Sequence, residues 1–351
     1  MPSRDAFKYL TQYGIKPSSA DGERYLLNDG LASEDDLTGL FEVLSSVKDI
    51  NSAPAVFTAI SLVANPMFDK IKENGYLEYF YEPFTETLKS YPSHSKSFEL
   101  WKEGFKKQIF VPQFHGREHL NVANWLKALK IGEPDTLFAF QNRTFGITPR
   151  NPINHVSYQA AFDFVDIDEL KYQRIAIEDG LNLFHQIHGF KASYFMPTNG
   201  PFNNSLEGTA ARSGIRFMGT AKKQDEPIGK GKSRYHFHYL GQRNSYDQRY
   251  ITRNCFFEPS SRLKQDWVDA CMSEIEIAFR WHKPAVVSSH RVNYIGWINP
   301  TNRDKGLRDL EVLLKSIITQ WPDVEFLTSN KLGYEISQLK TGDQPTNHKW
   351  H

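Results

Sequence analysis

Short apolar runs bounded by polar turns alternate along the chain with longer stretches in which apolar residues recur every three or four positions. The runs predict buried strands, and they lie at 24–30, 53–63, 108–112, 191–197, 215–219, 284–290 and 324–327. The longer stretches predict amphipathic helices, and they lie at 33–44, 115–129, 168–187, 204–214, 262–281 and 307–321. Strands that alternate with helices are typical of a parallel sheet covered by helices, so the pattern predicts an α/β fold.

A few regions depart from this alternation. Residues 66–107 are helical in pattern and rich in aromatic and acidic residues, which predicts an elaborated crossover inserted into the domain. Residues 158–165 predict an extended segment, and 221–232, rich in Lys and Gly, predict a mobile surface loop. The chain contains no evident repeat and no long linker, so we predict a single domain over 1–340 and a polar tail over 341–351.

Composition narrows the function classes. The 42 basic and 41 acidic residues give a formal charge of +1 without long blocks of like charge, which argues against nucleic-acid or membrane-surface partners. The two cysteines, Cys255 and Cys271, form no CxxC motif, so neither a disulfide framework nor a thiolate zinc site is indicated. The N-terminal residues lack the apolar core of a signal peptide, so we expect a cytoplasmic protein. The aromatic content of 14% indicates either a bulky core or aromatic sugar-binding platforms.

Three predicted strands end in a residue able to bind a metal or move a proton: Asp29, His115 and His290. His119 follows His115 by four residues, which would place both imidazoles on one helical face at a strand-to-helix junction. Catalytic groups gather at the carboxyl ends of parallel strands. A carboxylate and two imidazoles leave a position for water, as in catalytic zinc sites, while a separate histidine can protonate a leaving group.

The order of these motifs resembles the polysaccharide deacetylase (NodB-type) family. Asn28-Asp29-Gly30, His115-x-x-x-His119, the run 194–197 and the run 286–290 occur in the family's order and span about residues 25–333. The runs 115–119 and 289–293 further resemble a bacterial polysaccharide (de)acetylase-like subgroup. The resemblance implies a distorted (β/α) barrel of about seven parallel strands. It also implies a hydrolase that uses one divalent metal ion, most often zinc, to remove acetyl groups from a glycan through amide or ester cleavage.

Carried over by position, the resemblance makes Asp29, His115 and His119 the metal ligands and His290 the general acid. Two positions depart from the family pattern. Asn28 stands where the family has an aspartate base, and Met196 stands where it has an arginine. An asparagine cannot take a proton from water, so the base is open.

Glu118 is one candidate for the base, although its position also fits a partner that orients an imidazole, or a solvated charge. Asp163 and Glu258, near predicted strand ends, are the next candidates. Arg117 and Arg291 either supply the positive charge missing at Met196 or form structural ion pairs.

Three functions follow from these residues. The first is an active deacetylase acting on an acetylated glycan or sugar. The second is a catalytically weakened relative that binds glycan or metal without turnover. The third is an α/β protein whose histidines are incidental. The oligomeric state, the acylated sugar and the metal used in the cell stay open at this level.

Overall fold

The structure, a computed structural model, describes residues 9–17, 22–263 and 265–338. The tail predicted at 341–351 lies outside the described residues. In this part of the chain, we find no helix that combines the length and the apolar character needed to cross a membrane.

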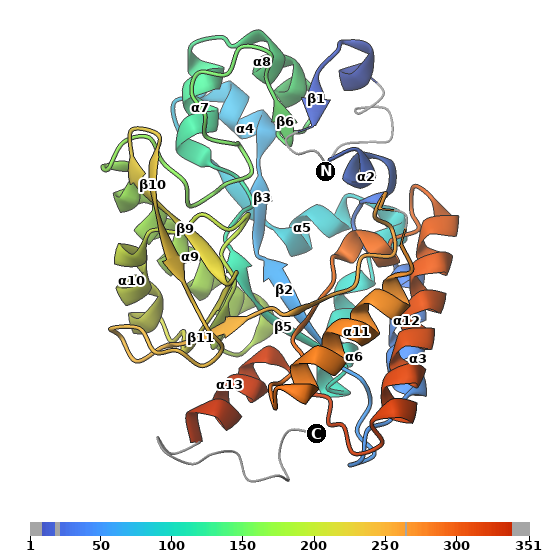
Figure 1. The fold of residues 1–351 in the computed structure, drawn as a ribbon. Coiled ribbons are helices and arrows are strands. Elements are labelled where there is room, and N and C mark those ends of the chain that lie inside the picture. Colours follow the sequence, from blue (N-terminus) through green and yellow to red (C-terminus); the bar gives the residue numbers. More distant parts are fainter. Residues whose placement is uncertain (1–8, 18–21, 264, 339–351) are drawn as a thin grey trace.

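The centre of the fold is a five-stranded parallel sheet, which confirms the predicted α/β class (Figure 1). Its order is β11 (Arg249–Thr252), β8 (Phe217–Thr220), β7 (Tyr194–Phe195), β5 (Phe110–Gly116) and β2 (Phe57–Leu62). In β5, positions 110–114 are buried, as expected for a strand covered on both faces. The side-chain oxygen of Gln113 in β5 accepts hydrogen bonds from the backbone amides of Ser193 and Tyr194. These bonds join β5 to the short strand β7.

The expected barrel is not confirmed. Two further parallel strands, β12 (Cys255–Phe256) and β13 (Val287–Ser288), pair with each other in a separate sheet, and the described strands form no closed sheet. A cavity of about 2100 Å³ is lined by residues of both β2 and β13. A closed (β/α) barrel instead fills its interior with side chains.

Helices cover the sheet on its two sides (Figure 1). One side carries α3 (Glu34–Ser46), α6 (Ser97–Lys106), α11 (Trp267–Arg280) and α12 (Pro300–Gln320), and the other carries α9 (Glu169–His188) and α10 (Glu207–Arg212). The remaining helices are α2 (Gly22–Asn28), α4 (Phe68–Glu73), α5 (Phe84–Lys89), α7 (Val122–Lys130), α8 (Pro134–Gln141) and α13 (Ser329–Gln338), with 3₁₀ turns at Pro92–His94, Asn204–Leu206 and Arg291–Tyr294.

The start of α3 follows the sequence closely. Ser33 caps the helix by accepting a hydrogen bond from the amide of Asp36, and the Asp36 carboxylate accepts one from the amide of Ser33. The acidic residues in the first turn stabilise the helix, because their negative charges lie at the positive end of the helix dipole. Its buried stripe includes Leu37, Phe41 and Leu44, which pack in one apolar cluster with residues of α11 and α12.

In the described residues, three antiparallel strand pairs lie outside the central sheet. They are β1 (Lys16–Pro17) with β6 (Ile147–Thr148), β3 (Ala64–Pro66) with β4 (Tyr81–Pro83), and β9 (Lys223–Gly229) with β10 (Lys232–Phe237). The last pair corrects the prediction of a mobile loop over 221–232. Lys230 and Gly231 have φ angles of 53° and 70°, the backbone signature of a tight hairpin turn. The lysines and glycines of this stretch therefore serve a hairpin rather than a mobile loop.

Three segments that were predicted to be strands or extended are not strands in the structure. Residues 24–30 form α2 and its end, because the run was too short to separate strand from helix by pattern alone. Residues 158–165 and 324–327 form no strand. The Phe326 amide donates to the Asp49 carboxylate and the Val324 carbonyl accepts from the Ile50 amide, so loop contacts take the place of strand pairing.

Candidate active site

The two neighbouring histidines stand at the carboxyl end of β5. His115 belongs to the strand, and Gly116 ends it with a φ of 140°, a region in which residues with a side chain are strained. The helix α7 begins only at Val122, after the cap residue Asn121. The prediction that His115 and His119 share a helical face is therefore wrong, because a loop carries His119 back toward the strand end.

The loop nevertheless brings the two imidazoles together. Their ring centroids lie 5.4 Å apart, with the rings nearly perpendicular. Nδ1 of His115 donates a hydrogen bond of 2.6 Å to the carbonyl oxygen of Met196, which leaves the lone pair of a neutral ring on Nε2. Burial lowers the pKa of His115 to about 3 and that of His119 to about 4. Both rings are therefore neutral at pH 7, the form that binds metal ions.

His119 also carries an unusual polar atom. Its Nδ1 is buried and has no hydrogen-bond partner among the described residues. Buried polar atoms are nearly always paired, so an orphan of this kind needs an explanation such as a missing ion or water.

Asp29 reaches the site from the end of α2. Its carboxylate accepts two hydrogen bonds from the Arg291 guanidinium, Nε to Oδ1 at 3.1 Å and Nη2 to Oδ2 at 2.8 Å. The Asp29 side chain is 19% exposed and that of Arg291 is 49% exposed, so this pair is open to solvent on the arginine side. Of the two roles considered for Arg291, the structure shows an ion pair, and its partner is the predicted metal ligand.

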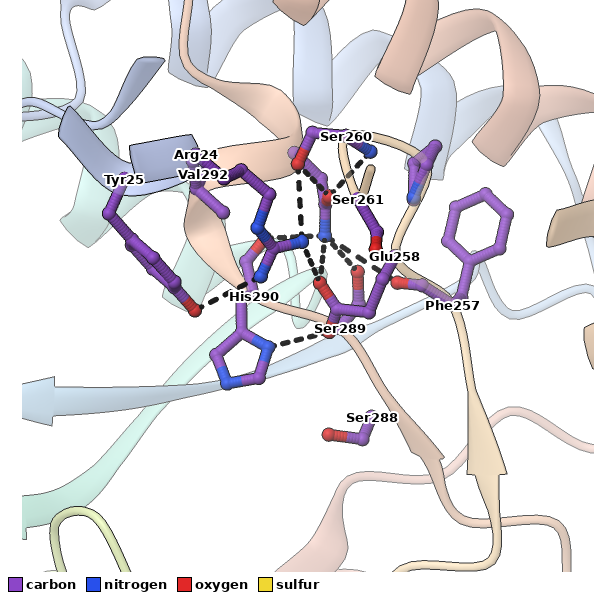
Figure 2. A network of polar contacts seen from close by, with 12 residues as sticks. Arg24, Tyr25, Phe257, Glu258, Ser260, Ser261, Ser288, Ser289, His290 and Val292 are labelled. Carbon is purple, nitrogen blue, oxygen red and sulfur yellow. Dashed lines mark hydrogen bonds and ion pairs between the residues drawn. The ribbon is translucent and has the colours of Figure 1, made fainter. Parts of the chain in front are cut away.

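The third histidine, His290, is held by a carboxylate (Figure 2). Its Nδ1 lies 2.5 Å from Oε1 of Glu258, and Oε2 of Glu258 accepts a bond of 2.8 Å from Arg24. The pKa of Glu258 is raised by burial, but hydrogen bonds from His290, Asn293 and Arg24 outweigh this and hold the pKa below its usual range. Glu258 therefore stays ionised and fixes the orientation of the His290 ring.

Further polar groups hold this arrangement in place. Asn293 donates to Oε2 of Glu258 at 3.0 Å and to the His290 carbonyl at 2.9 Å, while its own oxygen accepts from Ser260. The Arg24 side chain, only 3% exposed, lies beside the Tyr25 ring, which itself meets the His290 ring edge-on (Figure 2). The side chain of His290 remains 51% exposed.

The three histidines face one space. His115, His119, His290 and Asp29 all line the large cavity, together with Pro197 after β7. However, no group of three His, Cys, Asp or Glu side chains in the described ranges is already arranged to hold a metal ion.

The candidate bases lie elsewhere. Glu118 is 4% exposed, so it is not a solvated charge, and its carboxylate forms two hydrogen bonds with the equally buried Arg117. Asn28 donates to the Arg24 carbonyl and accepts from Asn299, so its amide serves the end of α2. Asp163 accepts from the amide of Phe164 and burial raises its pKa.

Sequence reasoning missed the partners of His290. Glu258 was considered only as a base, whereas the structure assigns it to His290. The sequence predicted no role for Arg24 and Asn293, which complete the network. Their roles depend on contacts with Glu258 across more than 30 positions of the chain. The only available signal was that Asn293 follows His290 by three residues.

A further pair of histidines lies at the end of β10. His236 in β10 and His238 directly after it face the same side, with ring centroids 6.3 Å apart. His236 pairs with Glu226 at 2.7 Å and His238 with Gln224 at 2.7 Å. These contacts join the two strands of the hairpin to each other.

Comparison with known proteins finds no matching family model and no matching curated sequence. Among solved structures, a candidate polysaccharide deacetylase from Mycobacterium smegmatis aligns over 86% of this chain and 77% of its own, with 10% identity and a TM-score of 0.42. A second candidate polysaccharide deacetylase, from Pseudomonas aeruginosa PAO1, aligns over 83% and 86%, with 9% identity and a TM-score of 0.34.

A 4-alpha-glucanotransferase from Thermococcus litoralis shows a likeness of the same order. It aligns over 90% of this chain with 11% identity and a TM-score of 0.43, and the chain spans 37% of its length. All three TM-scores are below 0.5, so these likenesses carry no conclusion about function.

Proposed function

We propose that this chain is a metal-dependent hydrolase that removes acetyl groups from a polysaccharide or oligosaccharide. The observation that carries the proposal is the meeting of two kinds of histidine in one cavity. His115 and His119 are neutral and paired, as metal ligands are, while His290 is held by an ionised carboxylate, as acid–base histidines are.

The donors at the end of β5 fit a zinc ion. His115 directs Nδ1 to a backbone carbonyl, a partner that commonly fixes the tautomer of a metal-binding imidazole, and His119 has an orphaned buried nitrogen. Asp29 would complete the set once Arg291 releases its carboxylate. When bound, a divalent metal would polarise an acyl oxygen and make water nucleophilic near neutral pH.

His290 would handle the proton of the leaving group. The Glu258 carboxylate holds the Nδ1 proton, so the imidazolium form presents its Nε2 proton to the cavity. Donation of that proton to the departing sugar nitrogen or oxygen breaks the acyl bond without forming an unstable anion.

The lack of an evident general base supports a second candidate function, that of a catalytically weakened relative. Asn28 cannot accept a proton and is hydrogen-bonded within α2, and Glu118 is committed to Arg117. A positioned base typically contributes about 10²–10⁴-fold, so hydrolysis without one would be slow. The weakened, glycan- or metal-binding relative is therefore the second candidate.

Acetate release from N-acetylated and O-acetylated oligosaccharides, with zinc present, tests the proposal. We expect slow release by the wild type and a further fall of about 10²–10⁴-fold in His290→Ala, because the leaving group loses its acid. His185→Ala, an exposed histidine of α9, is the matched control and should leave the rate unchanged. Absence of release from every substrate would reject the hydrolase and favour the binding protein.

A further inference from the structure

The β9–β10 hairpin displays two aromatic rings to solvent. Tyr235 is 55% exposed and Phe237 is 74% exposed. Both lie on one face of β10, since they are two residues apart, and their partners across the hairpin, Asp225 and Lys223, share that face. Two large rings side by side on an open strand are more than the scattered surface aromatics found on most proteins.

The aromatic face is not needed to attach the hairpin. The opposite face does this: the Gln224 amide donates to the Phe202 carbonyl, and the Glu226 carboxylate accepts from the Asn204 backbone amide. The pairs His236–Glu226 and His238–Gln224 hold the two strands of the hairpin together. The hairpin is therefore anchored from one side and presents its other side as a fixed platform.

The hairpin as a whole is basic. Residues 222–237 contain four lysines and one arginine but only one aspartate and one glutamate, in a chain whose formal charge is +1. All four lysines are exposed, whereas Glu226 is buried and paired with His236. Excess positive charge is therefore concentrated here and would attract an anionic ligand.

The platform is continuous with the candidate active site. Lys223 and Asp225 line the large cavity, and Nζ of Lys223 lies 3.9 Å from the centre of the Tyr235 ring. Within the described part of the chain, Oδ1 of Asp225 is buried and has no hydrogen-bond partner, so it can accept a hydrogen bond from a ligand hydroxyl. An extended molecule that leaves the cavity over β9 would meet this oxygen first and the two rings next.

We propose that this face, formed by Lys223, Asp225, Tyr235 and Phe237, binds an acidic polysaccharide such as a uronic-acid chain. Sugar rings pack their C–H faces against aromatic rings, whose faces carry partial negative charge. Asp225 accepts a sugar hydroxyl, and the lysines attract the carboxylates of the chain. The inference rests on the proposed function and narrows its substrate to an acidic, acetylated glycan.

Binding of short oligogalacturonides, measured by calorimetry at low and high salt, tests this subsite. We expect affinity at least about tenfold higher than for uncharged galactan oligosaccharides of equal length, and weaker binding at high salt. The double variant Tyr235→Ala/Phe237→Ala should lose at least about tenfold in affinity. Trp281→Ala, which removes a ring that is 72% exposed on another surface, should bind as the wild type does.

Hydrolysis of 4-nitrophenyl acetate separates the subsite from the hydrolase. The aromatic double variant should keep the wild-type rate on this small ester, because the ester does not reach the hairpin. Oligogalacturonide binding without any ester hydrolysis would support the subsite and contradict the hydrolase. Equal affinity for charged and neutral sugars, equal losses in Trp281→Ala, or tighter binding of a single-stranded oligonucleotide would each overturn the subsite.

Discussion

At the scale of single residues, the contact between Glu258 and His290 determines the orientation of the His290 ring. The Glu258 carboxylate accepts hydrogen bonds from His290, Arg24 and Asn293, and all three residues lie more than 30 positions away along the chain. A sequence pattern can therefore point to His290 as an acid, but it cannot show that Glu258 is its partner rather than a base.

Replacement of Glu258 by Gln tests this role. Gln keeps the shape but cannot carry the negative charge that stabilises a protonated His290, so we expect kcat for acetate release to fall by about 10²–10⁴-fold and its pH profile to move toward lower pH. Glu276→Gln, at an exposed position of α11, is the control. A wild-type kcat and pH profile in Glu258→Gln would contradict the assignment of Glu258 as the positioning residue.

Glu118 is a second single residue with a testable role, which is to stabilise the folded protein through its ion pair with Arg117. Its pair with Arg117 is 4% exposed on both sides, and Tyr172 also contacts the guanidinium. Removing one partner leaves a buried charge, so Glu118→Ala should lower the free energy of unfolding by about 3–5 kcal/mol in a denaturant titration. Glu103→Ala breaks an exposed pair with Lys107 and should cost less than about 1 kcal/mol. Similar losses in both variants would show that the buried pair has no special weight.

The elements show where pattern analysis succeeds and where it does not. Long periodic stretches such as α9 and α12 were predicted to within a few residues, apart from the earlier start of α12, because many buried positions repeat the same spacing. Residues 24–30 and the segment at His119 were misassigned. Their conformations depend on tertiary contacts, such as the Arg24–Glu258 pair, and on the backbone bend at Gly116.

One element, α9, also predicts a pH effect on stability. His188 packs against Phe184 with ring centroids 4.4 Å apart, and burial lowers its pKa to about 4. Its Nε2 is buried and has no hydrogen-bond partner in the ranges that the structure describes. The unfolded chain takes up this proton below about pH 6.5, whereas the folded chain does so only near pH 4. Its contribution to stability is therefore complete above pH 6.5 and is lost as the pH falls from 6.5 to 4.

Equilibrium unfolding of His188→Leu between pH 7 and pH 5 tests the effect. Relative to the variant, the wild type should lose up to about 2 kcal/mol over this range. His185→Leu, on the same helix but exposed, should keep the wild-type pH dependence. A His188→Leu curve parallel to that of the wild type would show that His188 already titrates normally in the folded protein.

At the scale of the whole molecule, the sequence predicted the α/β class, and the motifs at 115, 197 and 290 do meet at one cavity. It did not predict that the sheet stays open, because closure depends on the pairing of distant strand edges rather than on local pattern. The three histidines line one cavity, which also reaches Lys223 and Asp225 of the β9–β10 hairpin. The resemblance to the polysaccharide deacetylases stays a prediction.

Anomalous scattering at the zinc edge, from crystals grown with zinc, tests the central claim that this cavity is a metal-dependent hydrolytic site. The account predicts one strong peak about 2.0–2.2 Å from nitrogens of His115 and His119 and from an oxygen of Asp29, with the Arg291 guanidinium moved away from that carboxylate. The peak should be absent in His115→Ala. A peak bound by other residues, or none at this histidine pair at a zinc concentration that saturates the protein, would contradict the account.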